Sequence, residues 1–310
     1  MSIGRIVLHR LLTGLGVLWG AATLTFIALN LTGGDIALAI LGGPDALPTP
    51  EILAQVRREY GLDQPLIVQY GEYLARLAHG DLGDSYRLRI PVTQAIGQQI
   101  GATAQLAGLA GLLAISLSIA LALVTAKRAR WITSLSSGSE LVLSSMPSFV
   151  LGILLLLLFS FQFPILPPAG ADDWRAMVLP TLTLALPIAA VLTQVLRQEL
   201  DDILDQPFIT IARARGLSEA GVRLRHALRH VLTPLVTLSG FIFAGLLGGT
   251  VITETLFSRQ GVGRLMIDAA TNKDVPLVLG ITLLAAVVYV FINLLVDLFN
   301  TLADPRVARA

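Results

Sequence analysis

The chain alternates long apolar stretches with shorter polar ones. Six windows contain no Asp, Glu, Lys or Arg and are rich in Leu, Ile, Val and Ala. Each can supply the roughly 20 residues that a helix needs to cross the hydrocarbon core. Strands are a poor alternative, because the runs do not alternate and a lipid-facing backbone must close its hydrogen bonds in a helix or a barrel. The pattern predicts an all-α polytopic membrane protein with six transmembrane helices. The predicted spans cover approximately residues 8–31, 101–125, 141–163, 176–196, 232–254 and 276–300.

A polar insertion at residues 35–90 separates the first two predicted spans. Thr49-Pro50-Glu51 favours a helix start, and Tyr60-Gly61 favours its end. A second start at Asp63-Gln64-Pro65 precedes an apolar stripe that ends near His79-Gly80. The pattern predicts a helical insertion, which can serve as a lid packed on the bundle, as a docking face for an external partner, or as both.

A second polar segment, residues 205–230, is rich in Arg and lies between the fourth and fifth spans. Pro207 suits the first turn of a helix, Gly216 a left-handed stop, and Ser218 the N-cap of a second helix. We therefore expect two short helices joined at Gly216. The second helix is expected to be apolar on one side and basic elsewhere. Its apolar residues are Val222, Leu224, Ala227, Leu228 and Val231, and its basic residues are Arg223, Arg225 and Arg229.

Composition and charge support the same class of protein. Hydrophobic residues make up 54% of the chain and charged residues only 14%, against about 25% charged in an average soluble domain. The loops at 127–140 and 197–230 lie on the same side as both termini. Together these loops and termini carry 13 of the 22 Lys and Arg residues, which indicates the cytoplasmic side. The absence of Cys excludes disulfides and thiolate metal sites.

The residues carry no recognisable catalytic or nucleotide-binding pattern. A P-loop needs a Lys after Gly, whereas Lys127 follows Ala and Lys273 follows Asn. His226 and His230 have a spacing that can hold zinc, but no Glu lies between them, and we interpret them as polar residues of an Arg-rich helix. We predict no enzyme activity, no metal site and no nucleic-acid partner.

Three acidic residues lie at the edges of apolar runs. They are Glu140, Glu254 and Asp297. Because an ionisable residue in the middle of a membrane is costly, an edge position favours interfacial placement or a structural ion pair for each of them.

Several motifs in order and in register resemble the inner-membrane permease subunits of dipeptide, oligopeptide and nickel ABC importers. They are GLDQPLIVQYGEYLARLAHGDLGDS in the insertion, IARARGL at 211–217, RHALR at 225–229, ETLFSRQGVGRL at 254–265, KDVP at 273–276, NLLVD at 293–297 and DPR at 304–306. The resemblance implies the type I ABC importer permease fold over residues 1–310 and a bacterial inner membrane location. It also implies a second homologous permease subunit forming a heterodimer, two ABC ATPase subunits and a periplasmic or lipid-anchored solute-binding protein. ATP and Mg²⁺ would be used by the ATPase subunits, with no cofactor bound by this chain.

In that family the cytoplasmic EAA loop inserts a helix into a cleft of an ATPase subunit. The resemblance places this role on residues 205–230, although Thr210 and Ile211 stand where the general pattern has Glu and Ala. The implied coupling residues are Phe208, Ile209, Ile211, Ala212, Arg213, Arg215 and Gly216. The four apolar ones are expected to form a plug, and Gly216 to permit the sharp turn.

Solute recognition is the part that the residues leave open. Contact with the solute-binding protein is expected on the insertion and the last outer loop, at Tyr70, Tyr73, Asp81, Ser85 and Arg264. PTPEILAQ and Gly248-Gly249-Thr250 resemble nickel or metallophore permeases more than dipeptide ones, while the lack of Cys and of a membrane His favours a chelate or a peptide over a bare ion. Two alternatives remain: an ion-coupled secondary transporter, which should show midplane charges around an internal repeat, and a passive membrane scaffold.

Overall fold

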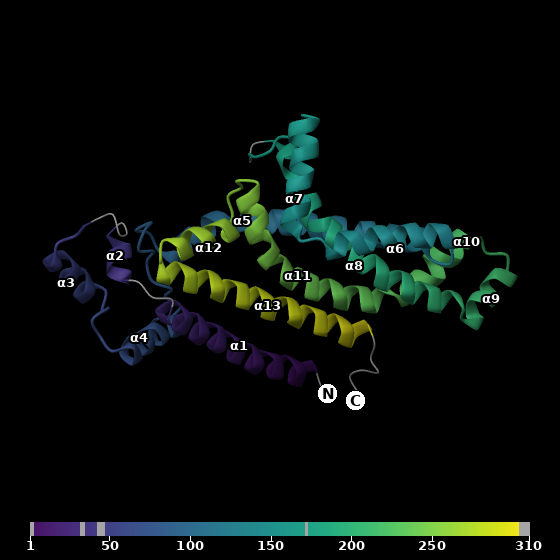
Figure 1. The fold of residues 1–310 in the computed structure, drawn as a ribbon. Helices are drawn as coiled ribbons and strands as arrows, with labels where there is room; N and C mark the ends of the chain where they lie inside the picture. The colour runs from purple at the N-terminus through teal and green to yellow at the C-terminus, as the bar shows by residue number, and fades with distance from the viewer. Residues whose placement is uncertain (1–2, 32–34, 42–46, 171–172, 304–310) are drawn as a thin grey trace. The chain divides into compact units, whose positions relative to one another are not determined.

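The computed structural model describes residues 3–31, 35–41, 47–170 and 173–303 (Figure 1). Within these ranges the chain is all-α, as predicted, and the β structure is limited to an isolated bridge between Asp84 and Pro91. The DPR motif at 304–306 lies outside the described residues.

The chain forms two compact units. Unit 1 comprises Met1–Ile6, Thr103–Arg259 and Phe291–Ala310, and unit 2 comprises Val7–Ala102 and Gln260–Val290. Three long helices contribute residues to both units: α1 (Ile3–Leu31), α5 (Val92–Thr125) and α13 (Val275–Ala303).

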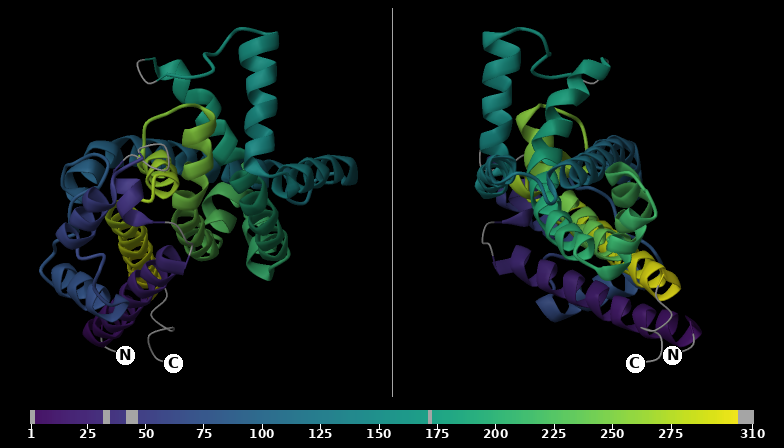
Figure 2. Two further views of the ribbon diagram at one scale, coloured as in Figure 1. Left: turned by 60° about the vertical axis from the view of Figure 1, so that its left-hand side comes forward. Right: turned by 90° about the vertical axis from the view of Figure 1, so that its right-hand side faces the viewer.

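Unit 2 contains most of α1 alongside the first half of α13, an arrangement that can be followed in Figures 1 and 2. Ala22 and Phe26 of α1 pack with Leu279 and Leu283 of α13 and with Tyr73. The remaining helices of this unit are α2 (Ile36–Ile40), α3 (Pro50–Glu59), α4 (Leu66–Ala78) and α12 (Val262–Thr271).

Helices α3 and α4 of the 35–90 insertion begin and end close to the predicted positions, whereas α2 was not predicted. The Thr49 hydroxyl accepts a hydrogen bond from the Ile52 N–H, and Pro50 occupies the first turn of α3. The helix stops before Gly61, which has a left-handed φ of 63°. Helix α4 follows Pro65 and ends at Ala78, one residue before the predicted stop. Local signals were sufficient here: α3 has a side-chain N-cap, whereas α4 begins after Pro65 without one.

Asp274 ties the end of the insertion to the start of α13. Its carboxylate accepts hydrogen bonds from the Ser85 hydroxyl and from the backbone N–H groups of Tyr86, Arg87 and Leu277. Both Asp274 and Ser85 are only 1% exposed. A single buried side chain therefore satisfies donors from two segments that are far apart in the sequence.

We expect Asp274→Asn to destabilise unit 2 by about 1–3 kcal/mol, because an amide cannot accept from all four donors. Thermal unfolding of the purified protein and limited proteolysis near residues 81–89 would measure the effect. Asp268→Asn, at an exposed position of α12, is the matched control. Equal behaviour of the two variants would contradict the assigned role of Asp274.

Unit 1 is organised around α8 (Val178–Leu204), which follows a 3-10 turn at Trp174–Met177. Three apolar clusters contain α8 residues: one with Leu179, one with Leu184 and Ala185, and one with Leu192 and Leu196. Helices α6 (Arg130–Ser145), α7 (Ser148–Leu156) and α11 (Leu232–Leu256) pack against it. The fourth predicted span is thus the central helix of this unit.

The third predicted span, 141–163, is not one continuous helix in the structure, and its extent as a membrane span stays a prediction. Residues 141–145 belong to α6, and the chain then bends by 103° into Ser148–Gln162, whose last six residues form a π-helix. Pro147 explains the break, because proline disfavours helical geometry at the preceding residue, and Met146 is extended with ψ 128°.

Four described helices are long and apolar enough to cross a membrane: Arg10–Leu31, Val92–Thr125, Trp174–Leu204 and Val275–Asn300. The bent α6 and α7 pair raises this number to five if it counts as one span. Helix α11, with 25 residues, lies over the fifth predicted span. The number six therefore stays a prediction.

Candidate functional site: the 205–230 loop

Helix α9 (Pro207–Ala214) follows directly on α8 and is held against it. Ile209 and Ala212, three residues apart on one helical face, are 0% and 6% exposed and pack in the cluster that contains Leu200 and Leu204. Phe208 and Ile211 are 38% and 54% exposed. The predicted four-residue plug is therefore divided. Two residues fix the helix to the chain, and two are available to a partner.

Gly216 makes the turn out of α9 with a φ of 82°, a region that favours glycine. Apart from its two chain neighbours, no described residue comes within 4 Å of the position that a Cβ atom would occupy, so the constraint comes from the backbone and not from crowding. Ser218 then caps the next helix by accepting from the Gly221 N–H. The predicted left-handed stop and second cap are both confirmed.

The second helix of the loop departs from the regular helix that the sequence suggests. It consists of α10 (Glu219–Gly221), a π-helix at Val222–Ala227 and a 3-10 turn at Leu228–His230. A π-turn closes hydrogen bonds over five residues and so changes which side chains share a face. Arg223 is consequently 8% exposed and Leu224 is 59% exposed, the reverse of the predicted pattern for these two residues.

Arg223 joins the loop to the end of α5. One guanidinium nitrogen donates to the backbone carbonyl of Leu123. Burial lowers the pKa of Arg223, and the positive charge of Arg128 lowers it further. An Arg remains charged despite such shifts, so the hydrogen bond is charge-assisted.

Lys127 joins the same end of α5 to the end of α8. Its backbone N–H donates to the Asp201 carboxylate, and its ammonium lies 2.7 Å from an Asp205 oxygen. Together with Arg223, these contacts connect α5, α8 and the loop at one end of unit 1. From the sequence, Lys127 and Arg223 entered only the assignment of topology and charge. Their partners, Asp201, Asp205 and Leu123, are far from them in the sequence and could not be predicted.

Arg213 and Glu219 form an ion pair across the Gly216 turn, with 2.8 Å between Nε and Oε1. The Arg213 hydrogen bond lowers the pKa of Glu219, and the Glu219 hydrogen bond raises that of Arg213. Both side chains are largely solvated, so the pair adds little to stability. Arg213 is committed to its own chain, whereas the exposed Arg215 forms no ion pair among the described residues.

Phe208 also contacts His230, with ring centroids 5.2 Å apart. The Arg229 Nε donates to the His230 ring at 3.3 Å. His230 is thus placed among aromatic and basic neighbours. Within the described ranges, no group of three His, Cys, Asp or Glu residues has the geometry of a metal site.

The predicted outer contact residues fall into two groups. Tyr73 and Ser85 are 8% and 1% exposed and belong to the interior of unit 2, so an external partner does not reach them. Tyr70 shares a 2.6 Å hydrogen bond with Thr23, Asp81 is exposed, and Arg264 is half-buried on α12. The sequence places all five on the insertion and the last outer loop, but it does not separate packing residues from surface residues.

Two of the three acidic residues at the ends of apolar runs, Glu140 and Glu254, have partners on other helices. Glu140 and Arg197 form a buried ion pair with two hydrogen bonds, of 2.6 and 2.7 Å. Of the two interpretations of Glu140, interfacial placement or a structural ion pair, the structure therefore has the ion pair. Glu254, fully buried, accepts a hydrogen bond from Thr103. The membrane-spanning part is therefore supported by polar contacts between helices.

The long apolar helices define a polytopic membrane protein, and the 205–230 loop lies at one end of its unit 1 with part of its surface exposed. The family described as binding-protein-dependent transport system inner membrane component matches residues 90–309. Its N-terminal companion family matches residues 3–107. The chain belongs to this family.

Similar proteins have names that agree with this class. The chain is 38% identical over 311 residues to a peptide transport system permease protein of Brucella abortus (strain 2308), covering 97% of this chain and 98% of the relative. It is 35% identical over 302 residues to the glutathione transport system permease protein GsiC of Salmonella typhimurium (strain LT2), with the same coverage. This chain is the inner-membrane permease subunit of a binding-protein-dependent ABC importer, and such a subunit works with ATPase and solute-binding partners. A transport permease is non-catalytic as a class.

Proposed function

We propose that this chain forms half of a heterodimeric translocation pathway with a second homologous permease, and that residues 205–230 dock on an ABC ATPase subunit. The main support for this proposal is that α9 has one buried face and one exposed apolar face. Ile209 and Ala212 anchor the helix, while Phe208 and Ile211 present apolar surface beside Arg215. An exposed apolar patch on a fixed, basic helix is typical of a docking site. Closure of the ATPase subunits, driven by ATP and Mg²⁺ bound there, would move the loop as a rigid body. Both chain termini would share its cytoplasmic side.

We further propose short peptides, including glutathione, as the solute class. The names of the relatives support this class, and so does a chain without Cys. The resemblance to nickel and metallophore permeases rests on two short stretches and has no support from the named relatives. The secondary transporter and scaffold alternatives do not account for a chain that matches a binding-protein-dependent family over both of its parts.

We expect Ile211→Glu to reduce co-purification of the ATPase subunits by about tenfold or more, because a charge would be placed in the apolar contact. ATP-driven uptake of glutathione and of a short peptide into proteoliposomes that contain the assembled transporter should fall with it.

Leu88→Glu is the matched control, since Leu88 is 44% exposed on the insertion, away from the loop sequence. It should leave ATPase binding unchanged. If Ile211→Glu retains both the ATPase and uptake, the docking proposal is wrong. If the wild-type transporter takes up a nickel chelate but neither peptide, the solute proposal is wrong while docking can still hold.

A further inference from the structure

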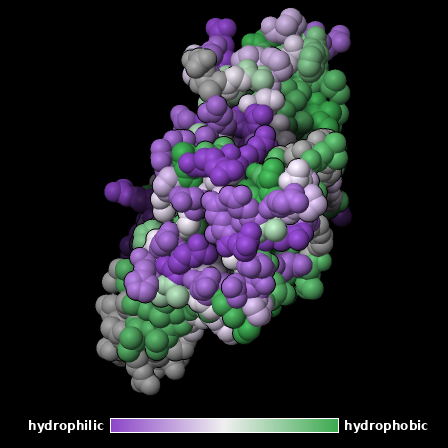
Figure 3. Space-filling model, turned by 90° about the vertical axis from the view of Figure 1, so that its left-hand side faces the viewer, coloured by the Kyte–Doolittle hydropathy of each residue, from purple (hydrophilic) through white to green (hydrophobic). Residues whose placement is uncertain are grey.

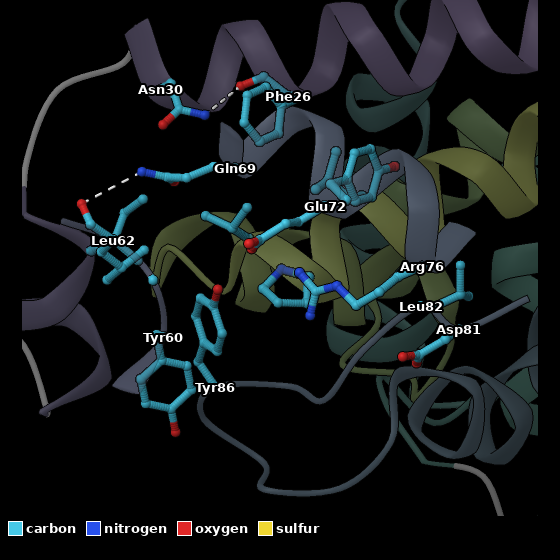
Figure 4. Close-up of a pocket in the computed structure, with 16 residues that line it drawn as sticks. Phe26, Asn30, Tyr60, Leu62, Gln69, Glu72, Arg76, Asp81, Leu82 and Tyr86 are labelled. Carbon is cyan, nitrogen blue, oxygen red and sulfur yellow. Dashed lines mark hydrogen bonds between the residues drawn. The ribbon is translucent and has the colours of Figure 1, made fainter. Parts of the chain in front are cut away.

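A narrow polar hollow lies within unit 2, between the end of α1, helix α4 and the 81–86 segment (Figure 4). It spans about 660 Å³ including space open to solvent, while the room for water-sized molecules is about 60 Å³. A buried water needs roughly 10–15 Å³ by that measure. The hollow therefore accommodates a small charged group and not a whole peptide.

Glu72 and Arg76 bring opposite charges into this hollow. They are four residues apart on α4, a spacing that puts Cβ atoms about 5–6 Å apart on one helix face. In Figure 4 the carboxylate of Glu72 and the guanidinium of Arg76 extend into the same space. Among the residues that the structure describes, the side chains of Glu72 and Arg76 form no hydrogen bond or ion pair. Both charges are free to bind a ligand.

Two tyrosines add hydroxyl groups to the lining. The Tyr86 hydroxyl points toward Glu72 and Arg76 in Figure 4. Burial raises the pKa of Tyr86 to about 12, although the positive charge of Arg76 acts to lower it. The phenol is therefore protonated and able to donate at neutral pH. Tyr73 also lines the hollow, and its buried hydroxyl has no hydrogen-bond partner in the described part of the chain. A buried polar atom of this kind calls for a partner such as a ligand or water.

The side of the molecule at which α3 and α4 lie in Figure 1 faces the viewer in Figure 3. Most of the surface in the centre of that view is hydrophilic. The 35–90 insertion contributes α4 to the hollow. A hydrophilic surface on this side of the insertion is what a site for a soluble ligand requires.

We propose that the hollow binds an α-amino-acid head group, whose ammonium and carboxylate are attached to one carbon atom. Glu72 accepts from the ammonium, Arg76 donates to the carboxylate, and Tyr86 adds a neutral donor. Adjacent opposite charges fit such a head group better than an ordinary peptide, whose two charged ends are separated by the backbone. A free amino acid presents this group, and so does a γ-linked peptide such as glutathione.

Equilibrium dialysis of radiolabelled alanine against the assembled transporter in lipid nanodiscs, without the solute-binding protein or ATP, tests the proposal. Binding should saturate. Competition by unlabelled glutathione would identify a γ-linked peptide as a source of the head group. Competition by free amino acids alone would identify the amino acids as its source. N-acetylalanine, alanine amide and alanylalanine should compete at least tenfold more weakly, because each lacks or separates one charge.

Glu72→Gln and Arg76→Gln should each weaken alanine binding about tenfold or more. Glu59→Gln and Arg58→Gln, exposed on α3 and outside the hollow, should not. The proposal is overturned by the absence of saturable binding, by equal competition from N-acetylalanine, or by equal losses in the control variants. Because the measurement uses no ATP and no transport, its failure is distinct from a failure of the docking or solute proposals.

Discussion

Arg197→Met is expected to destabilise unit 1 by about 3–5 kcal/mol, the usual cost of removing one partner from a buried ion pair. Arg197 is 7% exposed and Glu140 is 3% exposed. The guanidinium donates to both carboxylate oxygens and to the hydroxyls of Ser136 and Ser137. The variant would leave the buried Glu140 carboxylate without its guanidinium partner, which weakens the contact between α6 and α8.

The fraction of protein that stays monodisperse after detergent extraction and heating would measure this loss. Arg128→Met is the matched control, because Arg128 is exposed and, among the residues that the structure describes, its side chain donates only to the nearby carbonyl of Val124. The double variant Glu140→Gln with Arg197→Met should recover part of the loss, since it leaves no unpaired charge. Equal stability of Arg197→Met and Arg128→Met would show that the pair carries no such energy.

The sequence predicted best those features whose causes are local. The limits of α3 and α4, the turn at Gly216 and the cap at Ser218 each depend on residues within one or two helical turns, and all are present in the structure. The long apolar runs predicted the helices for the same reason, because hydrogen bonds inside a membrane close within the helix.

Features set by distant partners could not be predicted in the same way. The pairing of Glu140 with Arg197, and the capture of Ser85 by Asp274, join residues far apart in the sequence. Tyr73 lies in a polar insertion and was predicted to contact the solute-binding protein, but residues of α1 and α13 bury it. The break at Pro147 has a local cause, because proline disfavours helical geometry at the residue before it, and Met146 is extended.

The π-helix at Val222–Ala227 shows how a local irregularity changes a candidate site. Regular helical spacing assigns Leu224 to the apolar side and Arg223 to the charged side, and the structure exchanges them. This exchange gives Arg223 access to Leu123 at the end of α5. A charged residue that sequence reasoning counted as surface charge becomes a connection between the loop and a membrane helix.

We expect Arg223→Leu to uncouple the transporter. The ATPase subunits should still co-purify, because Phe208 and Ile211 are unchanged, but solute transported per ATP hydrolysed should fall about tenfold or more. The physical reason is the loss of a charge-assisted hydrogen bond, which contributes about 1.5–3 kcal/mol, between the moving loop and α5. Without it, a rigid-body displacement of the loop is absorbed at the junction before it reaches the helix.

Paired measurement of ATP hydrolysis and solute uptake in proteoliposomes separates uncoupling from loss of assembly. Arg225→Leu is the matched control, since Arg225 lies two residues further on in the same π-helix and is exposed. It should retain the wild-type ratio of transport to hydrolysis. Arg223→Lys keeps the charge but lacks the planar fork of Arg, so an intermediate ratio is expected. If Arg223→Leu transports with the wild-type ratio, the path from loop to helix runs through α8 and its Lys127 contacts instead, and Lys127 becomes the residue to change.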